Sequence, residues 1–187
     1  MIQNNIESVL KKHSIIPVVT FTNLNEIDDK ILNLLSKKIK CIEVTLRTPI
    51  AFEAIQEIKK KYGEDISVGV GTIISIENIQ KATDIGVDFM VSPGMNGELV
   101  KAMMQTKIPF IPGVATPSDI MAGLDLGCRF LKFFPANLFG AIAALKTYQQ
   151  LFPNVMFCPT GGVTESTYLD YLQLTNVLSV GGSWMVK

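Results

Sequence analysis

The chain has 187 residues, of which 48% are hydrophobic and 18% charged, and 17 Lys and Arg residues balance 17 Asp and Glu residues. These values predict one domain, residues 1–187, with a substantial core. A balanced charge offers no attraction to nucleic acid or an anionic membrane, and no apolar run is long enough to cross a bilayer, so we expect a cytoplasmic protein without nucleic-acid or membrane partners.

Short apolar runs alternate with amphipathic segments along the whole chain. After a short amphipathic helix within residues 1–13, we predict strands over 15–20, 41–46, 66–71, 88–92, 108–113, 129–134, 155–160 and 177–182. Helical spacing predicts helices at 26–38, 50–62, 97–106, 142–152 and 164–174. Two further helices begin at caps, one at Thr116 followed by Pro117 and Asp119, and one at Ser75 followed by Glu77.

This alternation predicts an α/β fold with a parallel sheet, since the strands are almost continuously apolar. Eight units of similar length favour a (β/α)₈ TIM barrel with an N-terminal helix. An open doubly wound sheet has the same local pattern, but no long glycine-rich dinucleotide loop is present. The printed sequence ends at Lys187, directly after the eighth strand, so the usual final helix is missing and we expect the N-terminal helix to cover an open end.

Histidine and cysteine are too scarce or too dispersed for several kinds of site. The single histidine, His13, excludes a histidine pair or a His-rich metal site. Cys41, Cys128 and Cys158 lie far apart in apolar segments, which is typical of buried free thiols in a reducing cytoplasm.

Three charged residues lie on predicted strands or at their carboxyl ends, where a barrel carries its active site. Strand alternation places Glu43 on the face opposite Ile42 and Val44, so Glu43 is expected to point inward. Lys132, in the segment RFLKFFPA, has apolar neighbours on both faces and is expected to be buried in either orientation. Arg47 follows Glu43 on the same face.

Two interpretations of these residues compete. In the structural one, Lys132 forms a buried ion pair with Glu43, and Arg47 lies on the surface. In the functional one, apolar surroundings disfavour the ammonium form, so that Lys132 attacks a ketone as an amine and forms an imine. Glu43 would then move protons, and the planar fork of Arg47 would bind the carboxylate of a 2-oxo acid.

Two glycine pairs lie at the ends of the seventh and eighth predicted strands. They are Gly161-Gly162, after Thr160, and Gly181-Gly182, before Ser183. Barrels frequently bind phosphate with backbone N–H groups of these two loops and a helix start, and the predicted helix at 164–174 follows the first pair. The pattern therefore predicts a phosphate site.

The sequence resembles the 2-keto-3-deoxy-6-phosphogluconate aldolase family, which also includes 4-hydroxy-2-oxoglutarate aldolases. The resemblance covers the whole chain and rests on matching blocks in order: PVV (17–19), EVTLRT (43–48), GVGT (69–72), SPG (92–94), IPG (111–113), LKFFPA (131–136), FCPTGG (157–162) and GGSW (181–184). It implies a class I aldolase on a TIM barrel, assembled as a homotrimer and needing no metal or cofactor other than the covalent lysine imine.

The resemblance also implies a role for each matching residue. Lys132 would form the imine and Glu43 would be the general acid–base, while Arg47 and Thr72 would bind the pyruvate carboxylate. The remaining matches would line the pocket (Pro93, Phe134 and Thr160) or bind phosphate (Gly161, Gly162, Gly182 and Ser183). Asn137 departs from the pattern, because a glutamate is common there.

The expected reaction is reversible cleavage of 2-keto-3-deoxy-6-phosphogluconate into pyruvate and glyceraldehyde 3-phosphate. Within the class, 4-hydroxy-2-oxoglutarate (yielding pyruvate and glyoxylate) and the galactonate epimer are alternative substrates. Outside it, a phosphate-binding barrel isomerase or synthase without imine chemistry and a non-catalytic oxo-acid-binding relative remain open. A requirement for Lys132 in catalysis would distinguish the aldolase from both of these alternatives.

Overall fold

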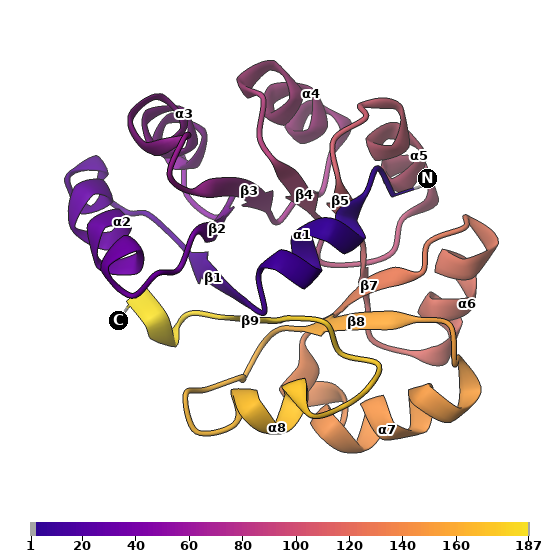
Figure 1. Ribbon diagram of the computed structural model, residues 1–187. Helices are drawn as coiled ribbons and strands as arrows, with labels where there is room; N and C mark the ends of the chain where they lie inside the picture. Colours follow the sequence, from indigo (N-terminus) through magenta and orange to yellow (C-terminus); the bar gives the residue numbers. More distant parts are fainter. Residues whose placement is uncertain (1–2, 187) are drawn as a thin grey trace.

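The chain folds into parallel strands surrounded by helices, an α/β architecture (Figure 1). The computed structural model describes residues 3–186. Its strands are β1 (Ile15–Val19), β2 (Cys41–Thr45), β3 (Ser67–Gly71), β4 (Phe89–Val91), β5 (Phe110–Ile111), β6 (Gly113–Val114), β7 (Phe130–Phe133), β8 (Met156–Pro159) and β9 (Val180–Gly182).

Helices follow the strands along the chain. They are α1 (Ile6–Lys12), α2 (Ile27–Ser36), α3 (Ala51–Tyr62), α4 (Ile76–Ile85), α5 (Gly97–Gln105), α6 (Pro117–Asp125), α7 (Ala141–Leu151) and α8 (Tyr168–Leu172), with 3-10 turns η1 (Leu24–Glu26), η2 (Ala136–Phe139) and η3 (Trp184–Val186). Across residues 3–186, no helix has both the length and the apolar character needed to cross a membrane.

Two of the predicted elements differ from the structure. The strand predicted over residues 108–113 is divided at Pro112 into β5 and β6, because proline has no N–H to donate to the sheet. The carbonyl of Pro112 nevertheless accepts a hydrogen bond from the Lys132 N–H (2.9 Å). The helix predicted over residues 164–174 is reduced to the five residues of α8.

The strands pair in parallel in two sheets. One has the order β5-β4-β3-β2-β1-β9, and the other has the order β6-β7-β8. Gly113 pairs with Lys132, and Lys132 pairs with Cys158, which fixes the register of the smaller sheet. Isolated bridges from Phe157 to Val177 and from Thr160 to Gly181 join β8 to the segment around β9.

The two faces of the sheet pack against different partners. Ile42 and Val44 of β2 belong to the large core cluster that includes Ile31, Ile55 and other buried helix residues. Cys41, on the opposite face, belongs to a smaller cluster, which also contains Ile6, Leu10, Ile16, Phe89, Val91, Ile111 and Cys158. The predicted alternation of β2 is therefore confirmed.

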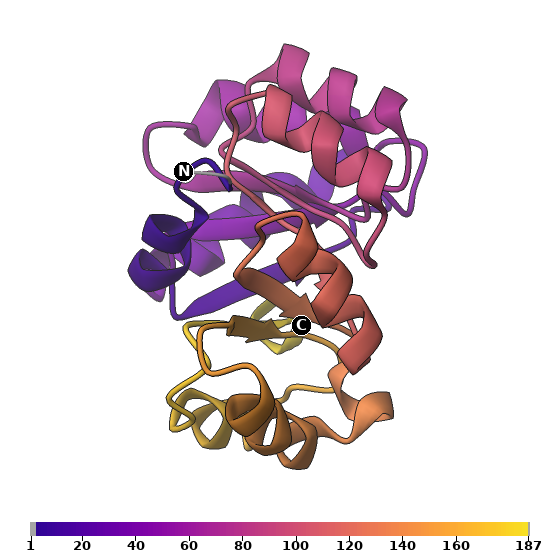
Figure 2. The same cartoon turned by 90° about the vertical axis from the view of Figure 1, so that its right-hand side faces the viewer.

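Helix α1 lies apart from the other helices. Its residues Ile6 and Leu10 pack against residues near the amino ends of the strands, such as Cys41 and Phe89. Figure 1 shows α1 crossing in front of the strands, and the turned view in Figure 2 places it at one side of the molecule. It covers the amino ends of the strands and leaves their carboxyl ends free for a site.

Candidate active site

A buried ion pair joins β2 to β7. Lys132 Nζ lies 2.9 Å from Glu43 Oε1 and 3.3 Å from Glu43 Oε2, although 89 residues separate the two in the chain. Their side chains are only 7% and 5% exposed. The structure thus brings together Glu43, which was expected to point inward, and Lys132, which was expected to be buried in either orientation. Because the carboxylate is within hydrogen-bond reach, a proton can pass directly from the ammonium to Glu43.

A glycine provides the space for this pair. Gly71, at the carboxyl end of β3, faces Glu43, and a Cβ atom placed on it would lie 2.1 Å from Glu43 Oε1. Real side-chain carbons do not approach an oxygen so closely. Gly71 therefore allows the carboxylate to lie flat against β3 and reach Lys132.

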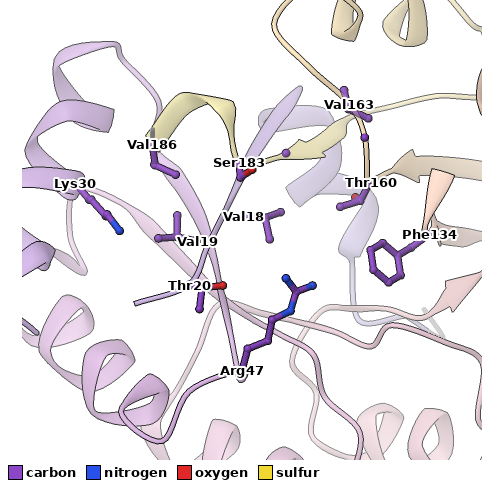
Figure 3. A pocket seen from close by; sticks show the side chains of 13 residues that line it. Val18, Val19, Thr20, Lys30, Arg47, Phe134, Thr160, Val163, Ser183 and Val186 are labelled. Carbon is purple, nitrogen blue, oxygen red and sulfur yellow. The ribbon is translucent and has the colours of Figure 1, made fainter. Parts of the chain in front are cut away.

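A cavity of about 390 Å³ opens at the carboxyl ends of the strands. Figure 3 shows the Arg47 side chain pointing into it from the end of β2, across from Phe134 and Thr160. The described residues that line it are Val18, Val19, Thr20, Lys30, Arg47, Phe134, Thr160, Gly161, Gly162, Val163, Gly182, Ser183 and Val186. Seven of the eleven sequence-predicted site residues are in this set.

The ion pair lies next to this cavity rather than on its wall. Lys132 Nζ is 5.2 Å from the centre of the Phe134 ring, and Phe134 lines the cavity. On the other side, Thr45 lies two residues beyond Glu43 and shares a 2.7 Å hydrogen bond with Thr20, which also lines the cavity. Lys132 therefore lies against a residue that lines the cavity.

Thr72 and Pro93 are the two predicted pocket residues that do not line the cavity. Thr72 follows β3 and has a positive φ of 66°, an uncommon conformation for a threonine. Pro93 follows β4, and its backbone carbonyl group packs closely against Gly113 of β6. Both lie at carboxyl ends of strands, and both are partly buried.

The glycine loops take up a backbone geometry that suits anion binding. Gly161 and Gly162 have φ values of 95° and 73°, in the region that glycine adopts readily. Both line the cavity beside Gly182 and Ser183. The expected helix start does not follow them directly, because α8 begins only at Tyr168. The predicted helix start is therefore displaced from the glycine pair to Tyr168.

Some lining residues were missed in the sequence. Lys30 comes from α2, where its i, i+4 partner Glu26 gives it the appearance of an ordinary surface residue. Thr20 follows β1, and only its place at a strand end could have identified it. Val163 and Val186 carry no polar signal that separates them from core residues.

The cysteines near the ion pair remain protonated thiols. Burial raises the pKa of Cys41, and the negative charge of Glu43 raises it further. Burial also raises the pKa of Cys158, an effect that the positive charge of Lys132 opposes. Within residues 3–186, no group of three or more His, Cys, Asp and Glu side chains is arranged to hold a metal ion.

Comparison with known proteins finds aldolases that are similar in sequence to almost the whole chain. The KHG/KDPG aldolase of Escherichia coli K12 is 39% identical over 184 residues, covering 98% of this chain and 86% of the relative. The 2-dehydro-3-deoxy-phosphogluconate aldolase of Dickeya dadantii is 38% identical over 184 residues, with the same coverage.

Solved structures agree with these sequence relatives. The 2-keto-3-deoxy-6-phosphogluconate aldolase of Zymomonas mobilis ZM4, solved with 3-phosphoglycerate, matches with a TM-score of 0.92 at 38% identity, covering 97% of this chain and 86% of that one. The KDPG aldolase of Legionella pneumophila, with pyruvate captured as a covalent carbinolamine, also has a TM-score of 0.92, at 39% identity and with 96% and 87% coverage. The family described as KDPG and KHG aldolase matches residues 6–187, and this chain belongs to it.

Proposed function

We propose that this protein is a class I (Schiff-base) aldolase that reversibly cleaves 2-keto-3-deoxy-6-phosphogluconate into pyruvate and glyceraldehyde 3-phosphate. The observation that carries the proposal is the buried Lys132–Glu43 pair beside a cavity that Arg47 enters. A relative that is 39% identical holds pyruvate as a covalent carbinolamine, the adduct that precedes an imine.

In the proposed mechanism, the Lys132–Glu43 contact supplies both the nucleophile and the base. Proton transfer from Lys132 to Glu43 across 2.9 Å leaves an amine that attacks the C2 carbonyl of the substrate. Glu43 returns that proton to the departing hydroxyl, and loss of water gives a protonated imine. Glu43, again a carboxylate, accepts the proton of the C4 hydroxyl as the C3–C4 electron pair moves toward the imine, which releases the aldehyde and leaves an enamine on Lys132. Glu43 then gives this proton to C3, and hydrolysis of the resulting imine releases pyruvate and restores Lys132.

The other predicted residues complete the site in this proposal. Arg47 binds the carboxylate of the 2-oxo acid, together with Thr72. Pro93, Phe134 and Thr160 shape the pocket around the reacting carbons. The loop N–H groups of Gly161, Gly162, Gly182 and Ser183 bind the phosphate at the far end of the substrate. The shared cavity supports these roles for Arg47, Phe134, Thr160 and the loops.

Cleavage of 4-hydroxy-2-oxoglutarate into pyruvate and glyoxylate is a second candidate activity. The Escherichia coli relative named KHG/KDPG aldolase favours it. The two reactions share the Lys132 imine and differ only in the group attached to C4. Arg47 and Lys132 would therefore act in the same way on both substrates.

We also propose the finer architecture that the sequence indicated. A closed (β/α)₈ barrel is supported by two continuities: residues 110–114 run from β5 of one sheet to β6 of the other, and the Thr160–Gly181 bridge joins β8 to β9. The family resemblance supports a cytoplasmic homotrimer. Exposed apolar side chains, including Ile74, Ile76, Leu138 and Phe139, offer surface for such an assembly.

Borohydride reduction in the presence of pyruvate tests the mechanism directly. Peptide mass spectrometry should find a stable pyruvyl adduct on Lys132 in the native protein. The Lys132→Arg variant keeps a cation beside Glu43 but cannot form an imine, so we expect it to fold, to give no adduct and to lose cleavage. An adduct on another lysine, or none in the folded native protein, would refute the imine mechanism.

A further inference from the structure

The cavity beside Lys132 contains a second cation that the cleavage chemistry does not use. Lys30 of α2 lines it together with Arg47. Among the described residues that line the cavity, only Lys30 and Arg47 have charged side chains, and both side chains carry a positive charge. Such a lining favours a ligand with two separate anionic groups. When the ligand displaces water from Lys30 and Arg47, each of the two cations can then form an ion pair with one of the anionic groups.

Neighbouring side chains hold Lys30 in place. Its ammonium pairs with Glu26, one helical turn earlier, and Glu26 also accepts a 2.8 Å hydrogen bond from Thr22. Lys30 Nζ lies 5.2 Å from the centre of the fully buried Phe21 ring. With 25% of its side chain exposed, Lys30 is a partly desolvated, fixed charge. Its ammonium has three N–H donors, which is enough to serve both Glu26 and a ligand oxygen.

The two cations enter the cavity from different directions. In Figure 3, Lys30 points in from α2, on the side where Ser183 and Val186 lie, whereas Arg47 rises from the end of β2 toward Phe134. A substrate whose carboxylate meets Arg47 and whose C2 faces Lys132 would extend its other end toward Ser183 and Lys30. The second cation therefore lies where a distal anionic group would be.

Resting on the proposed function, we infer that Lys30 is a specificity-determining residue that selects substrates with an anionic group at the end distant from the 2-oxo acid. A phosphate carries a charge of about −1.5 to −2 near neutral pH, so it gains more from a nearby ammonium than a carboxylate does. An uncharged hydroxyl gains least. Lys30 therefore stabilises bound substrates most when their distal group is a phosphate and least when it is uncharged.

The chain provides a matched control for this lysine. Lys81 of α4 also pairs with a glutamate at i−4, Glu77 (2.8 Å), and also lies over an aromatic ring, 5.6 Å from the centre of Phe52. It is not among the residues that line the cavity. Lys81→Met therefore removes the same local interactions as Lys30→Met without touching the site.

The experiment compares cleavage of 2-keto-3-deoxy-6-phosphogluconate with that of its unphosphorylated counterpart, 2-keto-3-deoxygluconate. For Lys30→Met, the ratio of the two kcat/KM values should fall about 10- to 100-fold, mainly through KM for the phosphorylated acid, as expected when a charge-assisted hydrogen bond is lost. Lys81→Met should leave the ratio unchanged, and Lys30→Arg should retain most of it. An unchanged ratio in Lys30→Met, or an equal loss for both substrates, would overturn the inference.

Pyruvate trapping separates this inference from the proposed function. Lys30→Met should form the pyruvyl adduct on Lys132 as readily as the native protein, because pyruvate has no distal anionic group. Failure of the native protein to form the adduct overturns the proposed function and the inference with it. A normal adduct combined with an unchanged selectivity ratio overturns the inference alone.

Discussion

Lys132 and Glu43 depend on each other in the interior of the molecule. Each side chain is at least nine-tenths buried, and dehydrating one such charge costs several kcal/mol. Their 2.9 Å contact offsets that cost, so removing one partner leaves an uncompensated charge. This is why Lys132→Arg, rather than Lys132→Ala, is the informative variant. It removes the nucleophile while keeping a positive partner for Glu43.

Gly71 should be as sensitive to substitution as a residue that contacts substrate. In Gly71→Ala the new methyl group would meet Glu43 Oε1 at 2.1 Å, so the carboxylate must move away from Lys132. Because a displacement of about 1 Å can cost a factor of about 100, we expect kcat for cleavage to fall by about that amount. Steady-state kinetics and circular dichroism of the purified variant would test this.

Gly97→Ala is the matched control for that substitution. No atom lies within 4 Å of a Cβ placed on Gly97, which is the first residue of α5. Alanine there should leave kcat unchanged and favour the helix slightly. A folded Gly71→Ala protein with native kcat would show that the position of Glu43 is not critical.

At the scale of single residues, the sequence was informative where a charge interrupts an apolar strand. Glu43 and Lys132 could be located because alternation and apolar neighbours leave them no route to solvent. Lys30 could not, because the Glu26–Lys30 spacing is the same as that of Glu77 and Lys81, which lie away from the cavity. Only the packing of α2 against the strand ends distinguishes the two pairs.

Among the helices, α6 has the most complete cap. Thr116 Oγ1 accepts a hydrogen bond from the Asp119 N–H, and the Asp119 carboxylate accepts from the N–H groups of Ala115 and Thr116 (3.0 and 2.9 Å). Partial burial acts to raise the pKa of Asp119, but these hydrogen bonds outweigh it and hold the pKa below its ordinary value of 3.8. The cap therefore favours the ionised form of the Asp119 carboxyl group in the folded state.

This cap predicts a pH-dependent effect of Asp119→Asn. A carboxyl group whose pKa is depressed by folding contributes stability above its unfolded pKa and loses it as the pH falls through the folded value. We expect Asp119→Asn to lower the free energy of unfolding by about 1 kcal/mol near neutral pH. As the pH falls below the ordinary pKa of 3.8 and then through the lower folded value, the difference from the native protein should shrink toward zero.

Urea unfolding at several pH values would measure that difference. Asp125→Asn, at the exposed end of the same helix, removes the same charge without disturbing the cap and should cost no stability. A loss for Asp119→Asn that stays constant down to the lowest pH would show that the carboxylate charge is not what stabilises α6.

Caps and periodicity explain why most elements could be predicted, and the exceptions have identifiable causes. The helix starts at Ser75 and Thr116 use side-chain hydrogen bonds within three residues, so they are visible locally. The division of the fifth predicted strand depends on which neighbour each half pairs with: β5 pairs with β4, and β6 pairs with β7. Pro112 marks the point of division in the sequence, but the neighbour that each half pairs with is a property of the whole fold and is not encoded in residues 108–113 alone.

At the scale of the whole molecule, Gln3 links the two sheets. Its side-chain NH₂ group donates to the carbonyls of Phe110 in β5 (3.3 Å) and Phe130 in β7 (2.7 Å). Its side-chain oxygen accepts from the N–H groups of Arg129 (2.7 Å) and Phe130 (2.9 Å). Gln3 is 5% exposed, so these groups have little access to water as an alternative partner.

Gln3→Glu should therefore weaken the fold although it barely changes shape. It removes the NH₂ donor and places a carboxylate oxygen against the carbonyls of Phe110 and Phe130. The substitution breaks two hydrogen bonds and leaves the carbonyls of Phe110 and Phe130 without their donor. We therefore expect the free energy of unfolding to fall by about 2–4 kcal/mol at neutral pH. Denaturant titration would measure it.

The control for that substitution is Gln56→Glu, on the exposed face of α3. A glutamate there has Lys60 at i+4, so the change should be neutral or slightly favourable. If Gln3→Glu unfolded at the same denaturant concentration as the native protein, the linking role of Gln3 would be wrong.

The pairing of β1 with β9 has a consequence for how the chain is made. Ile15, Ile16 and Pro17 are synthesised long before their partners on β9, which are Val180, Gly181 and Gly182. Until β9 emerges from the ribosome, one edge of β1 carries unpaired backbone groups that invite association with other chains. The cavity also lacks Gly182 and Ser183 until then. A nascent chain can therefore hold Glu43 and Lys132 already folded and still be unable to bind substrate before β9 and Ser183 have been made.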